Sequence, residues 1–239
     1  MMERSLRRMA LLCLMLAAVA LSGCMYPDDL REGKRGAGMD ELAAVQSAVR
    51  QYREAYGVLP IKTTDKDTPI YEKYVIDFQR LLNTPYLDRI PANAYEEGGP
   101  HIYVIVDPET DATVRWFDLA TAQQVNDVQR EVDRYAALYG RLPAGEPFAP
   151  GYSLIDYKRL RMARVQVRSV YSGGYLGLIM NEEGKVGVNY GPDIVQFLAN
   201  HGIEPEPGHD LREYLVERTP FVPVKSFPYV LRNGEVSLD

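Results

Sequence analysis

The chain has 239 residues, which is enough for one larger domain or two small ones with a buried core. Apolar residues make up 46% of it and charged residues 25%, the proportions of an ordinary globular protein. The formal net charge of −6 at pH 7 argues against general binding of nucleic acid or of anionic polymers.

The first residues have the parts of an export signal. Arg4, Arg7 and Arg8 precede an apolar run at residues 9–20. This run is shorter than the roughly 20 apolar residues that a spanning helix needs, so a secretory signal is the better interpretation. Small residues then lead to Cys24 and a polar segment.

The tetrad Leu21-Ser22-Gly23-Cys24 resembles the lipobox of bacterial lipoproteins. The resemblance implies that a diacylglycerol is attached to the Cys24 thiol and that signal peptidase II cuts before this residue. An ordinary signal peptide that ends in a chance cysteine is the alternative. Two or three acyl chains such as palmitate, at about 0.8 kcal/mol per buried CH₂, would anchor the protein firmly to a bilayer.

Cleavage at this site would remove residues 1–23 as a signal peptide and leave 216 residues. No disulfide would form, because Cys13 leaves with the signal and Cys24 carries the lipid. Loss of three Arg and one Glu with the signal takes the formal net charge from −6 to −8. Residues 24–38 contain three glycines and are expected to form a lipidated, flexible tether.

The chain then repeats itself. Apolar residues at helical spacing predict a helix that begins near Asp40 and ends in a Gly-x-x-Pro stop. The pattern returns 83 residues later, and residues 45–60 and 128–143 are identical at eight of 16 positions. Helical patterning explains the shared Val and Tyr positions in part, but not the shared Gln46 and Gln129.

A short turn and a β-hairpin are predicted after each helix. The turns at residues 76–81 and 155–160 correspond, and each contains Asp followed three residues later by Arg. The hairpins are expected at residues 101–117 and 175–190. The second unit is longer and adds a strand within residues 164–171, a short helix at 192–202 and a hairpin at 228–238.

The predicted fold class is α+β. Two tandem helix-plus-β-hairpin units, at residues 39–120 and 121–239, each pack a helix on a small antiparallel sheet. A helix that ends Tyr-x-x-x-Tyr-Gly-x-Leu-Pro before a hairpin resembles the soluble headpiece of pilin-like proteins. That resemblance concerns local shape alone, because the lipobox stands where a pilin-type leader would be.

No pattern in the sequence predicts a catalytic residue, a metal site or a cofactor. His101, His201 and His209 lack metal-ligand spacing and are expected at the surface, with the pair His209-Asp210 the one to inspect. The acidic run at residues 107–111 is expected to form a plain hairpin turn rather than a calcium site. No nucleophile elbow or phosphate-binding loop is present.

The repeated acid–base pairs are the candidate ligand-binding residues. An Asp three residues before an Arg on a helical turn can cap the turn and form an ion pair. A ligand site between the two units would use the same groups. The candidates are Asp77, Arg80, Asp156 and Arg159.

A local basic group interrupts the acidic chain. It forms either a solvated face or a patch that touches headgroup phosphates or an acidic partner. A sugar or peptide groove lined by Tyr175, Tyr190 or Trp116 is a further alternative. The basic residues are Lys158, Arg159, Arg161, Arg164 and Arg168.

The whole chain resembles uncharacterised lipoproteins of endospore-forming Gram-positive bacteria, which implies an envelope location and no known activity. The first hypothesis is a non-enzymatic binding or envelope accessory lipoprotein on the extracytoplasmic face of the cell membrane. Its partners would be the bilayer, through acylated Cys24, and an envelope protein. The alternative is the solute-binding lipoprotein of an ABC-type transporter, although 216 residues are few for two lobes. A cell-envelope hydrolase is least favoured, because catalytic motifs are missing.

Overall fold

The computed structural model describes residues 28–239, with side chains from residue 38 onward. The signal peptide, the lipobox and Cys24 lie outside these residues. The chain divides into two compact units, Met1–Asp40 and Glu41–Asp239, so both repeats belong to one unit. Within residues 28–239, no helix combines the length and the apolarity needed to cross a membrane.

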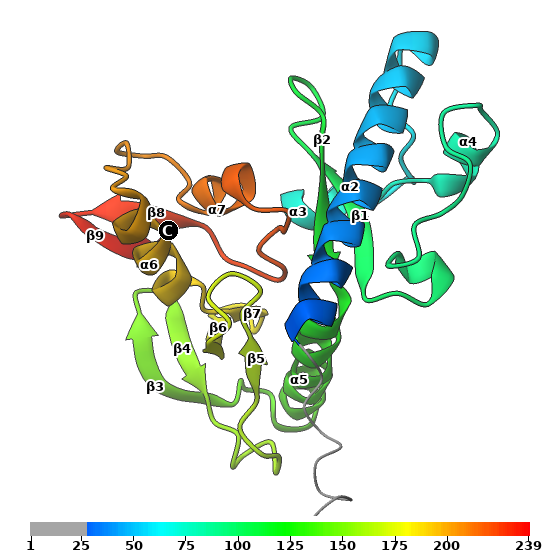
Figure 1. Cartoon of the computed structure of the whole chain (residues 1–239). Helices are drawn as coiled ribbons and strands as arrows, with labels where there is room; N and C mark the ends of the chain where they lie inside the picture. Colours follow the sequence, from blue (N-terminus) through cyan, green and yellow to red (C-terminus); the bar gives the residue numbers. More distant parts are fainter. Residues whose placement is uncertain (1–27) are drawn as a thin grey trace, which may run out of the picture. The chain divides into compact units, whose positions relative to one another are not determined.

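The first repeat contains one long helix, two short ones and a hairpin (Figure 1). Strands β1 and β2 pair antiparallel from His101↔Asp118 to Val106↔Thr113. The elements in chain order are α2 (Asp28–Tyr56), α3 (Ile70–Lys73), α4 (Phe78–Leu82), the 3₁₀ turn η1 (Tyr95–Glu97), β1 (His101–Val106) and β2 (Thr113–Asp118).

Helix α2 begins twelve residues before the predicted start at Asp40. The backbone of residues 28–38 is helical, so the prediction of a flexible tether is wrong for this part. Helix growth is cooperative, and each residue added to an existing helix gains a hydrogen bond. The glycines misled the prediction, since each costs only about 1 kcal/mol in a helix.

The second repeat contains a helix and a larger sheet, in the strand order β3-β4-β6-β5 with β7 paired to β6. All these pairings are antiparallel. The elements are α5 (Leu119–Tyr139), β3 (Ala144–Ala149), β4 (Tyr152–Ile155), β5 (Gln166–Arg168), β6 (Tyr175–Asn181), β7 (Val186–Val188), α6 (Gly191–His201), α7 (Arg212–Arg218), β8 (Tyr229–Arg232) and β9 (Glu235–Leu238).

The α+β class with small antiparallel sheets is confirmed, as are the predicted hairpins and helix α6. Five elements were not predicted: α3, α7, the two strands of hairpin β3–β4, and the 3₁₀ turn η1. The first two have only four and seven residues, too short for a clear helical period. Strand β3 reads AGEPFA, and its glycine and proline are typical of a turn rather than a strand.

The shared glutamines hold each helix to its own hairpin by the same two hydrogen bonds. The Gln46 amide donates to the Ala112 carbonyl (3.0 Å) and accepts from the Val114 N–H (2.7 Å). The Gln129 amide donates to the carbonyl of Gly184 (3.0 Å) and accepts from the N–H of Val186 (2.7 Å). The repeat seen in the sequence is therefore a repeat in bonding as well as in helix pattern.

Each helix buries its apolar stripe on its own sheet. In the first repeat, Leu42, Val45 and Val49 of α2 pack with residues of β1 and β2 such as Tyr103 and Val114. The corresponding stripe of α5 packs on β6, β7 and α6, with buried side chains at Val125, Val128, Val132 and Tyr135. Both stripes are fully shielded from water at their centres, so burial of apolar area is the main source of stability.

One C-terminal segment, residues 220–226, joins both repeats and is here named the strap. It forms parallel bridges at Trp116↔Phe221 on β2 and at Val188↔Ser226 on β7. The Trp116 N–H donates to the Pro220 carbonyl (2.7 Å), and the Val188 N–H donates to the Lys225 carbonyl (2.8 Å). The strap thus pairs alongside the second hairpin strand of each repeat.

The strap needs a glycine on β7. A side chain at Gly187 would place its Cβ 2.5 Å from the Phe227 ring and 2.8 Å from the Lys225 carbonyl oxygen. On the first repeat, strap residues Val222 and Val224 join a buried cluster with Val104 and Phe117. The first repeat therefore completes its core with residues more than 100 positions away.

Candidate functional site

Each candidate acid–base pair is bonded within its own turn. Arg80 Nε lies 3.2 Å from an Asp77 oxygen, and Arg159 Nε lies 3.0 Å from an Asp156 oxygen. Asp77 accepts the Gln79 N–H at the start of α4, and Asp156 accepts the N–H of Arg159 (3.2 Å). These contacts are those of caps with local ion pairs.

None of these four residues lines either of the two cavities described below. Arg159 also donates to the Ala144 carbonyl (3.1 Å), which ties the turn to strand β3. The structure brings each Asp to its own Arg, and the observed partners are local in both repeats.

The histidines differ from one another in setting. His101, expected at the surface, is half-buried: its ring stacks on Trp116 with centroids 5.0 Å apart, and Phe221 meets its edge at 5.5 Å. His101 Nδ1 has no hydrogen-bond partner among the described residues, and desolvation lowers the pKa of the imidazole. His209 lies 3.0 Å from Glu213, whereas Asp210 binds Arg212.

A charged cavity of about 290 Å³ lies between the hairpin β1–β2 and helix α7. Arg115 crosses it and donates from Nε to the Val216 carbonyl (2.7 Å), and desolvation lowers the pKa of its guanidinium. Burial raises the pKa of Glu213. Among the described residues, no three His, Cys, Asp or Glu side chains form a metal-binding group. The cavity is lined by Tyr71, Val106, Asp107, Asp111, Thr113, Arg115, Glu213, Val216 and Glu217.

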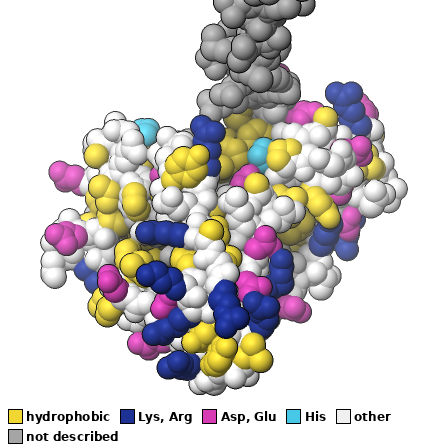
Figure 2. All heavy atoms as spheres, turned by 90° about the horizontal axis from the view of Figure 1, so that it is seen from below, with side chains coloured by type: hydrophobic (Ala, Val, Ile, Leu, Met, Phe, Trp, Pro, Cys, Tyr) yellow, Lys and Arg dark blue, Asp and Glu magenta, His cyan; other side chains and the backbone are white. Residues whose placement is uncertain are grey.

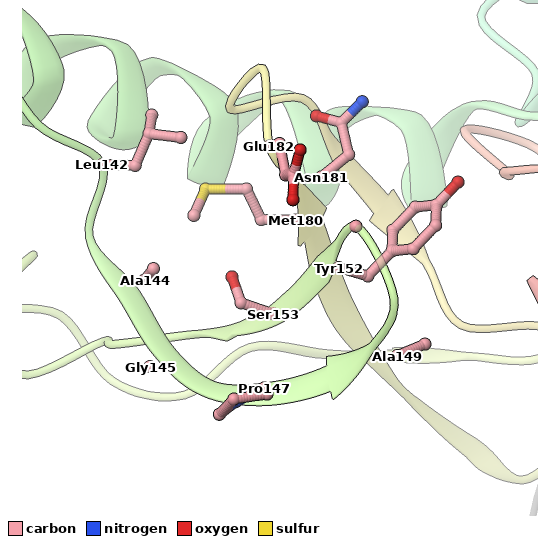
Figure 3. Close-up of a pocket in the computed structure, with 11 residues that line it drawn as sticks. Leu142, Ala144, Gly145, Pro147, Ala149, Tyr152, Ser153, Met180, Asn181 and Glu182 are labelled. Carbon is pink, nitrogen blue, oxygen red and sulfur yellow. The ribbon is translucent and has the colours of Figure 1, made fainter.

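An open, mostly apolar cavity of about 460 Å³ lies in the second repeat (Figure 3). It is here named the groove. The ribbon of hairpin β3–β4 curves along one side of it, and Met180, Asn181 and Glu182, at the end of β6, lie on the other. Apolar side chains predominate in its lining. The lining residues are Leu142, Ala144, Gly145, Pro147, Ala149, Gly151, Tyr152, Ser153, Met180, Asn181 and Glu182.

The curvature of β3 explains the groove. The register of β3 against β4 shifts twice, between Ala144 and Pro147 and again between Pro147 and Ala149. Such irregularities bend a strand away from its partner, and Pro147 has no N–H for a ladder bond. Since β3 is also the edge strand of its sheet, no other strand of residues 28–239 lies beside its outer side. Sequence reasoning missed the groove, because its signal is a proline inside a short strand.

Comparison with known proteins gives one partial match. The family model described as the YphF family N-terminal domain matches residues 38–118. The matched range covers all the described α2 side chains and the hairpin β1–β2, and it stops before α5. The chain matches no curated protein and no solved structure.

Proposed function

We propose that this chain is an extracytoplasmic lipoprotein, anchored through acylated Cys24, that binds an apolar segment of an envelope protein in the groove. The groove is the observation that carries the binding role. It is open, its walls are mostly apolar, and one wall is an edge strand with no further strand beside it among the described residues.

An extended peptide suits these features. A peptide laid along an edge strand gains main-chain hydrogen bonds, while apolar walls accept alternate side chains. Pro147 limits the ladder to part of the strand, so affinity would come mainly from the apolar walls.

The anchor is tested by labelling. The Cys24→Ala variant of the full chain should fail to incorporate palmitate and should leave the detergent phase in a phase-separation assay. The matched control is Cys13→Ala, which removes the other cysteine and should keep the label. Equal labelling of wild type and Cys24→Ala would contradict the anchor.

The groove is tested by photo-crosslinking in intact cells. A benzophenone amino acid at position 147, which lines the groove and is exposed, should give one dominant protein adduct. Ala149→Glu places a carboxylate in the apolar groove and should abolish that adduct. A benzophenone at position 235, exposed on β9, is the control and should not give the same adduct. An adduct that survives Ala149→Glu would contradict a groove-bound partner.

The charged cavity supports a second candidate function, the binding of a small polar solute. Its four carboxylates and one guanidinium would suit a ligand with an amine and an acid group, such as an amino acid. A thermal-shift screen with amino acids separates the two proposals. A shift that is lost in Arg115→Gln would favour solute binding, whereas no shift with any of them would leave the groove as the binding site.

A further inference from the structure

Five cations of the second repeat form an exposed surface, here named the basic surface. All five side chains are exposed to solvent. From residue 157 to residue 181 the chain has no Asp or Glu, although its formal net charge is −6. The basic surface comprises Lys158, Arg159, Arg161, Arg164 and Arg168.

The exposed face of hairpin β5–β6 continues this surface. Arg168 pairs in register with Tyr175, which is 71% exposed. The Arg164 guanidinium lies over β6 at Gly177, 3.9 Å from where a Cβ would stand. Two arginines and a tyrosine therefore share one face, with Val167 buried behind it.

The charges are held on an anchored backbone. Leu160 is buried between them, and the Asp156 carboxylate accepts the N–H groups of Lys158 and Arg159. Arg161 has φ 55°, a left-handed conformation that few side chains other than Asn and Asp adopt readily. The cations are thus displayed on a defined turn.

The first repeat shows which of these charges the fold needs. The ion pair of Arg159 has a counterpart in Arg80, so it belongs to the repeated turn. Lys158 and Arg161 stand where the first repeat has Gln79 and Leu82. Among the described residues, only Arg159 of the five cations forms an ion pair. The other four charges exceed what the turn requires.

We propose that the basic surface binds the anionic headgroups of a phospholipid bilayer. The loop of residues 156–165 lies at the lower end of the molecule in Figure 1. Figure 2 views the molecule from below, and Lys and Arg side chains gather on this face. Each cation near an anionic bilayer contributes about 1 kcal/mol, which is about fivefold in affinity. Tyr175 adds a ring with a polar tip, which suits the headgroup level. The inference rests on the proposed function, because an anchored chain stays beside a bilayer.

Vesicle sedimentation tests this surface without the anchor. Residues 24–239 with Cys24→Ser contain the whole compact unit, in which every buried core residue lies. This protein should sediment with phosphatidylglycerol vesicles and not with phosphatidylcholine vesicles. Binding should fall as salt rises, since the Debye length shortens to about 3 Å at 1 M.

The test variant combines Lys158→Gln, Arg161→Asn, Arg164→Gln and Arg168→Gln, with asparagine chosen for the left-handed backbone. Its affinity for anionic vesicles should fall by more than 100-fold. Tyr175→Ser removes the ring at the headgroup level and should weaken binding by a smaller factor. The matched control loses the same charge at four exposed cations elsewhere and should bind within threefold of wild type. It replaces Arg50, Lys66, Arg89 and Arg218 with Gln.

Three results would overturn the assignment. One is equal sedimentation with both kinds of vesicle, and another is an equal loss in the control variant, which would reveal a net-charge effect. The third is binding to heparin with no binding to vesicles, which would assign the surface to a soluble polyanion. Palmitate labelling of Cys24 is scored separately, so failure of the anchor and failure of this surface are distinguishable.

Discussion

In the first repeat, the chain between helix and sheet forms helix α3, whose Tyr71 is buried with Val222 and Val224 of the strap. In the second repeat, the corresponding chain forms the curved hairpin β3–β4 at a sheet edge and borders the groove. The elements on either side of this segment are arranged alike in both repeats. The bridges Ile61↔Ile76 and Ala144↔Ile155 stand at equivalent positions. The two repeats therefore share their helix-to-hairpin framework and differ in the connecting segment.

The difference shows where function can reside. Positions that bond helix to hairpin are the same in both repeats, whereas the groove and the basic surface occur only in the second. A feature present in one copy alone is not required by the fold.

The largest effect is expected at the strap. Val222→Asp would bury an unpaired carboxylate in a fully buried position and should lower the free energy of unfolding by about 4 kcal/mol or more. Because the strap pairs with β2 and with β7, hydrogen exchange should rise in both repeats. Val230→Asp, at a half-exposed site of β8, is the control. Faster exchange in the first repeat alone would show that the repeats are energetically separate.

The two shared glutamines test whether the bonds between helix and hairpin stabilise both repeats equally. Gln46→Leu and Gln129→Leu each leave an N–H of the second hairpin strand and a carbonyl of the preceding turn without their partner. Each should cost about 2–4 kcal/mol in chemical denaturation. Gln51→Leu is the control, since Gln51 is exposed and bonds only to Ser47 within its own helix. Unequal losses of unfolding free energy at the two sites would mean that the equivalent bonds stabilise the two repeats to different extents.

His101 should make the stability of the first repeat depend on pH. Its folded pKa lies below the ordinary value of 6.5, so the folded state disfavours the proton. Stability should be complete above pH 6.5 and should decline as pH falls toward the folded pKa, because the unfolded chain takes up the proton first. His101→Phe keeps the stack on Trp116 and should reduce the loss of Tm between pH 7.5 and 5.5. If His101→Phe loses as much Tm as wild type over this pH range, the pH dependence belongs to other titrating groups.

The smallest effects are expected at the repeated turns. Asp77→Ala and Asp156→Ala remove caps and should each cost about 1 kcal/mol. Arg80→Gln removes a partly exposed ion pair and should change stability by less than about 1 kcal/mol. Thermal denaturation measures all three. A gain in stability on removal of these charges would indicate a strained arrangement of the kind that binding sites keep.

Much of the fold could be predicted because its signals are local. The helical stripes, their glycine stops and the hairpin turns all depend on neighbours within a few residues, and the structure contains each of them. The groove and the half-buried setting of His101 could not be predicted in this way. His101 meets Trp116 across the hairpin and Phe221 from the strap, so its environment depends on residues distant in sequence.

By itself, the sequence determined the α+β class, the two tandem helix-plus-hairpin units and the shared glutamines. Periodicity and repetition can be recognised directly in the order of the residues. The tertiary structure alone decided that one strap closes both repeats, that the candidate acid–base pairs bond locally, and that β3 bends away to form a groove. The physical reason is that parallel bridges and buried clusters join residues from 38 to 153 positions apart. No local pattern specifies which distant segment completes them.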